Sequence, residues 1–232
     1  MIIDFHTHVL PGVDDGARDV ETSLEMLRQS ARQGVQILVA TSHFYASLDR
    51  VESFLERRRA SLEALRAQAA PELPDVVPGA EVAFFRGISD AKQIEALRIE
   101  NTDALLLEMP FRRWTQDELD EVAALVERRG FRLILAHLER YLPMWENRRW
   151  IQQLLEMDLI VQINAEGLLD WRQRGKLLKM FEKGQAQLLG SDCHGLHRRP
   201  PNLGEGREVL RRKLGESVLD GMDRLGEQIL SR

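Results

Sequence analysis

Short apolar runs recur along this chain, and most of them lead directly into a histidine or an acid. Their lengths, and the helix-like stretches that separate them, are typical of buried parallel strands. The predicted strands are residues 2–5, 37–40, 76–82, 104–108, 132–136, 159–163 and 187–190. These seven runs predict seven β/α units, with no internal repeat and no linker.

The stretches between the runs repeat apolar residues at the spacing of amphipathic helices. Asp19 is placed to cap the first helix and Gly34 to end it, and Thr115 and Gly130 do the same for a later one. The predicted helices are residues 19–34, 49–70, 89–97, 115–130, 146–157 and 168–183, the last bent near Gly175, with a helical pattern resuming after Gly204. Strands alternating with helices predict an α/β barrel.

Length and composition fit one such barrel. The chain has 232 residues, 44% of them hydrophobic and 30% charged, and a barrel of this kind commonly occupies about 250 residues. We therefore expect a single domain over residues 1–232. The 32 basic and 37 acidic residues are spread along the chain and give a net charge of −5, which argues against nucleic acid or an anionic membrane surface as a partner.

Targeting features are absent from the sequence. No stretch approaches the roughly 18 apolar residues of a membrane span, so we expect no membrane insertion. The N-terminus has no basic segment followed by a long apolar one, as a signal peptide would. Cys193 is the single cysteine, which excludes an internal disulfide. Together these features favour a cytoplasmic location.

Candidate metal ligands stand at the ends of the predicted strands. His6 and His8 are two residues apart on an extended segment, so both side chains point the same way and can reach one ion. The same position on other strands is taken by His43, Glu81, Glu108, His137, Asp192 and His194. Because the carboxyl ends of parallel strands meet on one rim, these side chains should converge. Buried strands rarely hold unpaired carboxylates, which favours a metal site.

The first strand is followed by a glycine-flanked loop that holds two adjacent acids, Asp14 and Asp15. Its glycines allow the chain to approach the site closely. A simple turn with two exposed acids is the alternative, and two adjacent carboxylates need not both be ligands.

At these residues the chain resembles the polymerase and histidinol phosphatase (PHP) superfamily. More closely, it resembles the bacterial manganese-dependent protein-tyrosine phosphatases of capsule and exopolysaccharide synthesis. The resemblance lies in residues 6–16 (HTHVLPGVDDG), 40–43 (ATSH), 79–81 (GAE), 107–108 (LE), 136–141 (AHLERY) and 191–194 (SDCH). It covers Ile2 to about Pro201, and the last thirty residues fit less well because the expected Asn-Pro before the final helix is missing.

The resemblance implies a distorted (β/α)7 TIM-like barrel that holds three divalent metal ions. The implied ligands are His6, His8, Glu81 and Asp192 for the first ion, Glu81, Glu108 and His137 for the second, and Asp15, His43 and His194 for the third. Much of the superfamily has a histidine where this chain has Asp15, and an acid there points to the tyrosine-phosphatase branch.

The chemistry of these side chains agrees with that implication. Carboxylates and imidazoles without thiolates suit Mn²⁺, Mg²⁺, Zn²⁺ or Fe, and Mn²⁺ is the ion that the resemblance implies. Ions about 3.5–4 Å apart can share a bridging hydroxide, lower its pKa and clamp a phosphate. Arg140 and Arg199 follow His137 and His194 closely, so each could bind phosphate oxygens bidentately. A surface salt bridge is the alternative for each arginine.

Two further features have competing interpretations. Cys193 and Arg199 have the Cys-x5-Arg spacing of thiol-dependent tyrosine phosphatases, but the loop holds one glycine and Pro200-Pro201 stands where the required helix should begin. Aromatic residues near the predicted rim could line a slot for a phenyl ring or simply pack against helices. They are Phe44, Tyr45, Phe111, Trp114 and Tyr141.

We therefore predict a metal-dependent protein-tyrosine phosphatase whose metal-bridging hydroxide attacks phosphotyrosine. The expected partner is a phosphotyrosyl protein, namely a bacterial tyrosine kinase of capsular or exopolysaccharide synthesis. The main competing hypothesis is a related phosphoesterase acting on a small phosphomonoester such as histidinol phosphate. Two weaker hypotheses are a regulatory metal-binding module without catalysis and an amidohydrolase, which would make less use of Arg140 and Arg199.

Overall fold

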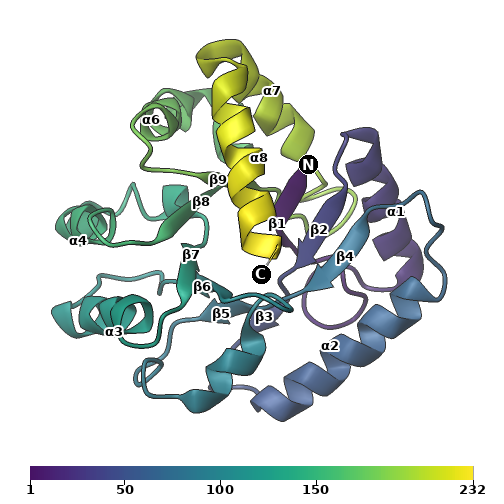
Figure 1. The fold of residues 1–232 in the computed structure, drawn as a ribbon, viewed down its shortest axis with the longest axis horizontal. Helices are drawn as coiled ribbons and strands as arrows, with labels where there is room; N and C mark the ends of the chain where they lie inside the picture. Colours follow the sequence, from purple (N-terminus) through teal and green to yellow (C-terminus); the bar gives the residue numbers. More distant parts are fainter. Residues whose placement is uncertain (232) are drawn as a thin grey trace.

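Parallel strands curl around the centre of the molecule, and helices cover their outer side (Figure 1). The computed structural model describes residues 1–231, so the last residue of the predicted 1–232 domain lies outside the described part. The described strands are β1 (Ile3–Thr7), β2 (Ile37–Ala40), β3 (His43–Phe44), β4 (Asp75–Pro78), β5 (Glu81–Ala83), β6 (Ala104–Glu108), β7 (Arg132–Leu135), β8 (Ile160–Asn164) and β9 (Leu188–Gly190). This is the predicted α/β class.

The strands form two parallel sheets, with orders β1-β2-β4 and β3-β5-β6-β7-β8-β9. The segment that follows β9 runs beside β1, because Asp192 N donates to His6 O at 2.7 Å and His8 N donates to Cys193 O at 3.0 Å. The first and last strands of the fold therefore meet. This contact curves the strands into a half-barrel and brings the ends of distant strands to one rim.

Helices surround these strands (Figure 1). They are α1 (Val20–Arg32), α2 (Val51–Arg66), α3 (Gln116–Glu127), α4 (Arg148–Leu154), α5 (Ala165–Leu169), α6 (Trp171–Glu182), α7 (Leu203–Leu214) and α8 (Glu216–Leu230). Two predicted caps are confirmed. Asp19 Oδ1 accepts from Thr22 N at 2.8 Å, and Thr115 forms a capping box with Glu118 at the start of α3.

The predicted strand over residues 76–82 is instead two strands in different sheets. β4 pairs with β2, whereas β5 pairs with β3 and β6. Pro78 ends β4 and has no N–H for the ladder, and Glu81 N turns to the carbonyls of Thr41 and Ser42 at 3.1 Å. At this point β5 pairs with the two-residue strand β3, which no apolar run predicted. The described residues thus form nine strand segments rather than seven.

Two predicted helices also differ. In place of a helix over residues 89–97 there is a 3₁₀ helix at Lys92–Leu97, because Gly87 N and Ser89 N donate to the Glu121 carboxylate on α3 at 2.8 and 3.1 Å. The helix predicted over residues 168–183 breaks at Asp170 rather than near Gly175. Asp170 has an extended backbone and its side chain caps α6.

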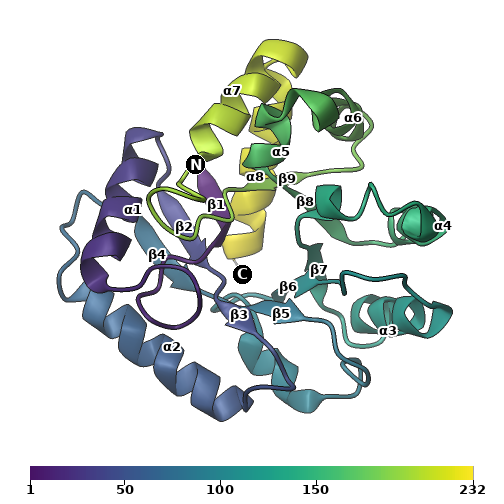
Figure 2. The same ribbon diagram turned by 180° about the vertical axis from the view of Figure 1, so that it is seen from behind.

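The chain ends in two helices separated by Gly215, whose φ of 89° a side chain would disfavour. The second helix, α8, crosses in front of the strands in Figure 1 and lies behind them in Figure 2. The Met1 amino group pairs with Glu227 at 2.6 Å, and Arg132, the first residue of β7, donates to Gln228 O at 3.4 Å. Helix α8 therefore lies where β1 and β7 begin, at the edge opposite the strand ends.

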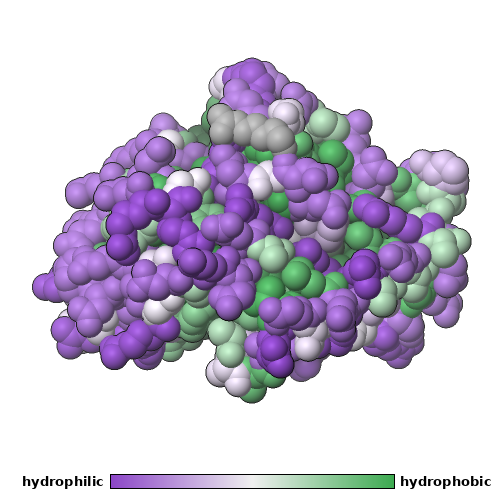
Figure 3. Space-filling view, turned by 60° about the horizontal axis from the view of Figure 1, so that its bottom comes forward, coloured by the Kyte–Doolittle hydropathy of each residue, from purple (hydrophilic) through white to green (hydrophobic). Residues whose placement is uncertain are grey.

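Hydrophilic residues cover most of the face in Figure 3, and hydrophobic ones gather toward its middle and one side. Within residues 1–231, no helix combines the length and the apolar character needed to cross a membrane.

Candidate metal centre

The nine predicted metal ligands come together at the rim formed by the carboxyl ends of the strands. They are supplied by β1 (His6), the loop after it (His8, Asp15), β3 (His43), β5 (Glu81), β6 (Glu108), the turn after β7 (His137) and the segment after β9 (Asp192, His194). Carboxylate and imidazole atoms from seven separate segments thus reach one place, as the parallel topology requires.

Glu81 lies at the centre of this cluster. Its Oε2 is 3.2 Å from His6 Nε2, 3.4 Å from His8 Nε2 and 2.9 Å from His43 Nδ1. Its Oε1 is 2.8 Å from His137 Nε2. The Nε2 atoms of His6 and His8 are themselves 3.2 Å apart. One buried carboxylate therefore meets four imidazoles whose nitrogens converge on a common space.

Two further acids extend the cluster on either side. Asp192 Oδ1 is 3.5 Å from His6 Nε2 and 3.3 Å from His8 Nε2, so these imidazoles lie between Asp192 and Glu81. Glu108 Oε1 is 3.4 Å from His137 Nε2. The acids are thus separated by imidazoles, an arrangement that allows neighbouring ions to share ligands.

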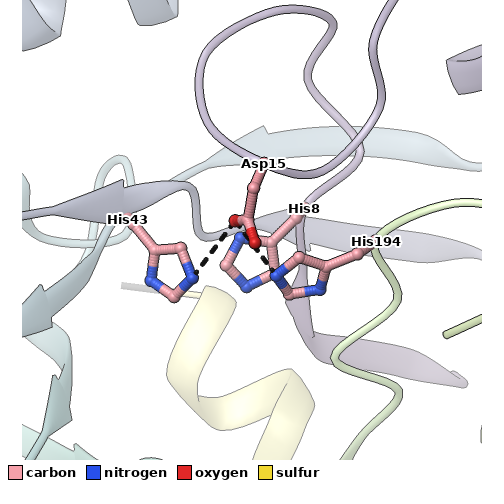
Figure 4. Close-up of side chains that lie close together, drawn as sticks. All are labelled: His8, Asp15, His43 and His194. Carbon is pink, nitrogen blue, oxygen red and sulfur yellow. Dashed lines mark ion pairs between the residues drawn. The ribbon is translucent and has the colours of Figure 1, made fainter. Parts of the chain in front are cut away.

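A third group lies toward solvent. Asp15 Oδ1 is 3.6 Å from His43 Nε2 and 3.4 Å from His194 Nε2, and Figure 4 shows these side chains pointing toward one another with His8. Ligand atoms of all four residues lie within 4.8 Å of one another. The same holds for His6, His8 and Glu81, and for His43, Glu81 and Glu108.

Several buried atoms in the cluster have no hydrogen-bond partner among the described residues. They are Glu81 Oε2, His43 Nδ1, His137 Nδ1 and His194 Nε2. Burying a polar atom without a partner costs free energy, and a cation would complete the shell of a carboxylate or imidazole lone pair. The donor set has no thiolate and suits hard or borderline divalent ions. The residues present therefore fit metal ions.

The electrostatics keep the central acids ionised. Burial raises the pKa of Glu81, but the nearby His6, His137 and His43 side chains outweigh burial and hold it well below its ordinary value. The pKa of Asp192 is also lowered, because His6, His8 and Arg140 outweigh its burial. Ionised carboxylates are the form that binds metal.

Backbone geometry at the rim is unusual. His137 and Asp192 have φ values of 35° and 52°, in the left-handed region that non-glycine residues rarely adopt. A side chain on Gly190 would lie 2.5 Å from His6 Cβ, and one on Gly16 would lie 2.1 Å from His8 O. Strained positions and close backbone approaches cluster at functional sites, as they do here.

The two adjacent acids of the first loop have different positions. The Asp15 side chain is 66% exposed and reaches His43 and His194, whereas that of Asp14 is 5% exposed. Asp14 Oδ2 lies 2.7 Å from His8 Nδ1 and accepts from His43 N at 2.9 Å. Asp14 therefore orients a candidate ligand, the role that outer partners of metal-bound histidines commonly play.

Strand β8 contributes two side chains that sequence reasoning missed. Gln162 Oε1 lies 3.1 Å from His6 Nδ1 and accepts from His137 N at 2.9 Å. Asn164 Nδ2 donates to Asp192 Oδ2 at 2.8 Å. Both are buried polar residues at alternate positions of an otherwise apolar strand. That alternation was a usable signal, because it puts two amides on the face that carries the ligands.

Both predicted arginines reach the cluster. Arg140 Nη2 donates to Asp192 Oδ2. Arg199 Nη1 lies 3.6 Å from Asp192 Oδ1, and its Nη2 lies 3.6 Å from Asp15 Oδ2. About a third of each side chain stays exposed. Both guanidinium groups therefore border the candidate ligands rather than forming a salt bridge elsewhere on the surface.

A family model described as capsular polysaccharide synthesis, CpsB/CapC, matches residues 2–225. The chain belongs to the CpsB/CapC family. This match confirms the resemblance found in the sequence motifs. The match also extends beyond Pro201 into α8. Most of the last thirty residues are therefore covered by the family model, although the motifs predicted a poorer fit there.

Relatives of this CpsB/CapC chain carry phosphatase names. It is 26% identical to the tyrosine-protein phosphatase CpsB of Streptococcus agalactiae, over 93% of this chain and 92% of that protein. It is 26% identical to the tyrosine-protein phosphatase YwqE of Bacillus subtilis, over 94% and 87%. A crystal structure from work on YwqE and the Streptococcus pneumoniae CpsB, described as metal-dependent tyrosine phosphatases, superposes with a TM-score of 0.85 at 24% identity, covering 99% and 94%. The fold is therefore that of these structures.

The cysteine of this CpsB/CapC chain is unsuited to nucleophilic attack. Cys193 is fully buried. Burial and the nearby Asp4 carboxylate raise the pKa of its thiol well above the ordinary 9.0. A nucleophilic cysteine needs an accessible thiolate, so the Cys-x5-Arg spacing has no catalytic meaning here.

Proposed function

We propose that this CpsB/CapC chain is a metal-dependent protein-tyrosine phosphatase. One observation carries the proposal: two arginines contact Asp192, and Asp192 belongs to the cluster of acids and imidazoles. Hydrolysis of a phosphoester requires mainly positioning and neutralisation of phosphate charge. The arginines supply fixed positive charge, and the cluster fits divalent cations. The tyrosine-phosphatase names of its relatives support the substrate class.

We propose that the nine ligands hold three divalent ions, with Mn²⁺ as the physiological metal. Such ions, when bound, would activate water and neutralise charge on the phosphate. Asp14 and Gln162 would keep His8 and His6 oriented through their Nδ1 atoms. Asn164 would hold Asp192 in place beside Arg140.

Arg140 and Arg199 would bind the non-bridging phosphate oxygens. Arginine presents a planar pair of donors that matches two oxygens of a phosphate. In the present structure both guanidinium groups face Asp192, so a bound phosphate would exchange part of that contact for its own oxygens. The leaving group of phosphotyrosine is a phenolate of pKa about 10, which departs more easily than a serine alkoxide.

We further propose that residues 1–232 act as one domain of distorted (β/α)7 type and that the enzyme works in the cytoplasm. Its substrate would be a phosphotyrosyl protein, namely a tyrosine kinase of capsular or exopolysaccharide synthesis. The family match to capsular polysaccharide synthesis supports this pathway.

Phosphate release from phosphotyrosyl peptides, phosphoseryl peptides and histidinol phosphate tests the substrate class. We expect the phosphotyrosyl peptides to have the highest kcat/KM, with weak dependence on flanking residues. If histidinol phosphate is turned over much faster, the cluster and its chemistry stand but the tyrosine-phosphatase assignment is wrong.

A further inference from the structure

Tertiary packing divides the five aromatic residues near the rim into two groups. Phe44, Trp114 and Tyr141 are 2%, 1% and 0% exposed, so they belong to the core. Tyr45 and Phe111 are 37% and 55% exposed. Of the five, only these two present a ring surface that a bound molecule could contact.

The Phe111 ring is fixed in place although it is more than half exposed. It stacks on His137, with centroids 5.9 Å apart and planes at 24°, and on Tyr141, at 4.8 Å and 24°. Tyr141 is itself anchored, because its hydroxyl donates to Met109 O at 2.5 Å. A ring held by two others loses little freedom when a ligand stacks on it, which favours binding.

Phe111 packs on two residues that flank the turn carrying one of the arginines. Its two stacking partners, His137 and Tyr141, flank the 3₁₀ turn Leu138–Arg140. Arg140 extends from that turn to Asp192. Because Phe111 stacks on the candidate ligand His137, a phosphate bound at the cluster and held by Arg140 can place a directly attached ring toward Phe111. An alkyl phosphate has no flat group to place there.

The ring of Tyr45 is a weaker candidate. It lies 5.3 Å from the His43 ring and is tilted by 32°, and it is less exposed than Phe111. No second aromatic ring among the described residues supports it, whereas Phe111 rests on two.

We propose that Phe111 is the platform on which the aromatic ring of the substrate stacks, and that it sets the preference for aryl over alkyl phosphates. This inference rests on the proposed phosphatase function and names the residue that recognises its substrate class. Offset stacking of two aromatic rings contributes enough free energy to shift binding by about tenfold.

Binding of phenylphosphonate and methylphosphonate to the Mn²⁺-loaded protein, measured by calorimetry, tests the platform without turnover. We expect the wild type to prefer phenylphosphonate and Phe111→Leu to lose about tenfold of that preference. Phe111→Trp should retain the preference because it keeps a flat ring. Trp145→Leu is the matched control, since it removes an aromatic ring that is 83% exposed and makes no ring contact with the candidate ligands.

Two results would overturn the inference. One is a wild type that binds the two phosphonates equally well. The other is a loss of preference confined to Tyr45→Leu, which would assign the platform to that ring.

Steady-state kinetics distinguish a failure of this inference from a failure of the proposed function. If Phe111→Leu raises KM for phosphotyrosyl peptide alone, at unchanged kcat, both proposals stand. If wild-type enzyme hydrolyses phosphoseryl peptide equally fast, the tyrosine-phosphatase proposal fails while the phosphonate comparison still decides the platform.

Discussion

At the scale of single residues, the two carboxylate oxygens of Asp192 contact different groups at the rim. Its Oδ1 faces the imidazoles of His6 and His8, while its Oδ2 accepts from Asn164 and Arg140. One carboxylate thus joins the candidate metal cluster to the candidate phosphate clamp. Loss of Arg140 would leave Asp192 bonded to Asn164 and facing both imidazoles, so a substitution there should affect catalysis without dismantling the cluster.

Arg140→Ala should lower kcat/KM for a phosphotyrosyl peptide by about 10², the size typical for loss of one group that stabilises transition-state charge. Arg140→Lys should recover only part of this loss, because it restores the charge without the planar pair of donors. Steady-state kinetics measure both. Arg148→Ala is the control, since Arg148 is exposed at the start of α4. Unchanged kinetics in Arg140→Ala would remove Arg140 from the site.

Cys193→Ser should keep kcat/KM within about tenfold of the wild type, a barrier change of roughly 1.4 kcal/mol. The reason is that the thiol is buried and protonated beneath the cluster. Kinetics should be combined with a metal assay on the same sample. A loss on the order of 10⁴ with metals still bound would mean that the thiol is the nucleophile.

At the scale of elements, the packing of α8 against β1 depends on the positions of its glycines. Gly226 packs against β1, and a Cβ there would lie 3.0 Å from Phe5 Cε2 and 3.2 Å from Ile3 Cδ1. Gly221, on the same helix, would meet nothing within 4 Å. The close contact lets α8 lie tightly where β1 begins, under the strand that carries His6.

Gly221→Ala should stabilise the protein by about 0.5–1 kcal/mol, because alanine loses less backbone entropy than glycine in a helix. Gly226→Ala has the same propensity gain but must push Phe5 and Ile3 apart, so it should be at least about 1 kcal/mol less stable than Gly221→Ala. Urea unfolding of the two variants measures the difference. Equal free energies of unfolding would show that α8 does not pack closely on β1.

At the scale of the whole molecule, the rim is where the ends of the fold are joined. The segment after β9 is bonded to β1, and its Asp192 and His194 meet ligands from β1, from the first loop and from β3. Ions bound there would tie together segments from both ends of the chain. Binding to the folded state alone stabilises that state by mass action.

Removing metal should abolish phosphatase activity and lower the melting temperature, and Mn²⁺ should restore both. Without cations, several buried ligand atoms lack hydrogen-bond partners among the described residues. Glu81→Gln should lose the rise in melting temperature with Mn²⁺, because Glu81 is central to the cluster. Full activity in a sample verified to be free of metal would contradict the cluster proposal.

The sequence by itself determined the α/β class, most strand positions and the candidate ligands. These features depend on local patterns: apolar runs, capping residues such as Asp19 and Thr115, and side chains that follow strand ends. The parallel topology then brings those side chains to one rim. For that reason His6 and Glu81 could be expected at the same rim, and the family resemblance assigned both to the first ion.

Only the tertiary structure decided which neighbouring residues differ in role. The family resemblance named Asp15 as a ligand but gave Asp14 no role, and only the structure shows Asp14 buried against His8 while Asp15 faces solvent. Phe111 and Tyr141 are both rim aromatics, yet only Phe111 is exposed. Burial and partner atoms depend on segments that are distant along the chain, and a local pattern holds no information about them. The same reason explains why β4 and β5 are separate strands.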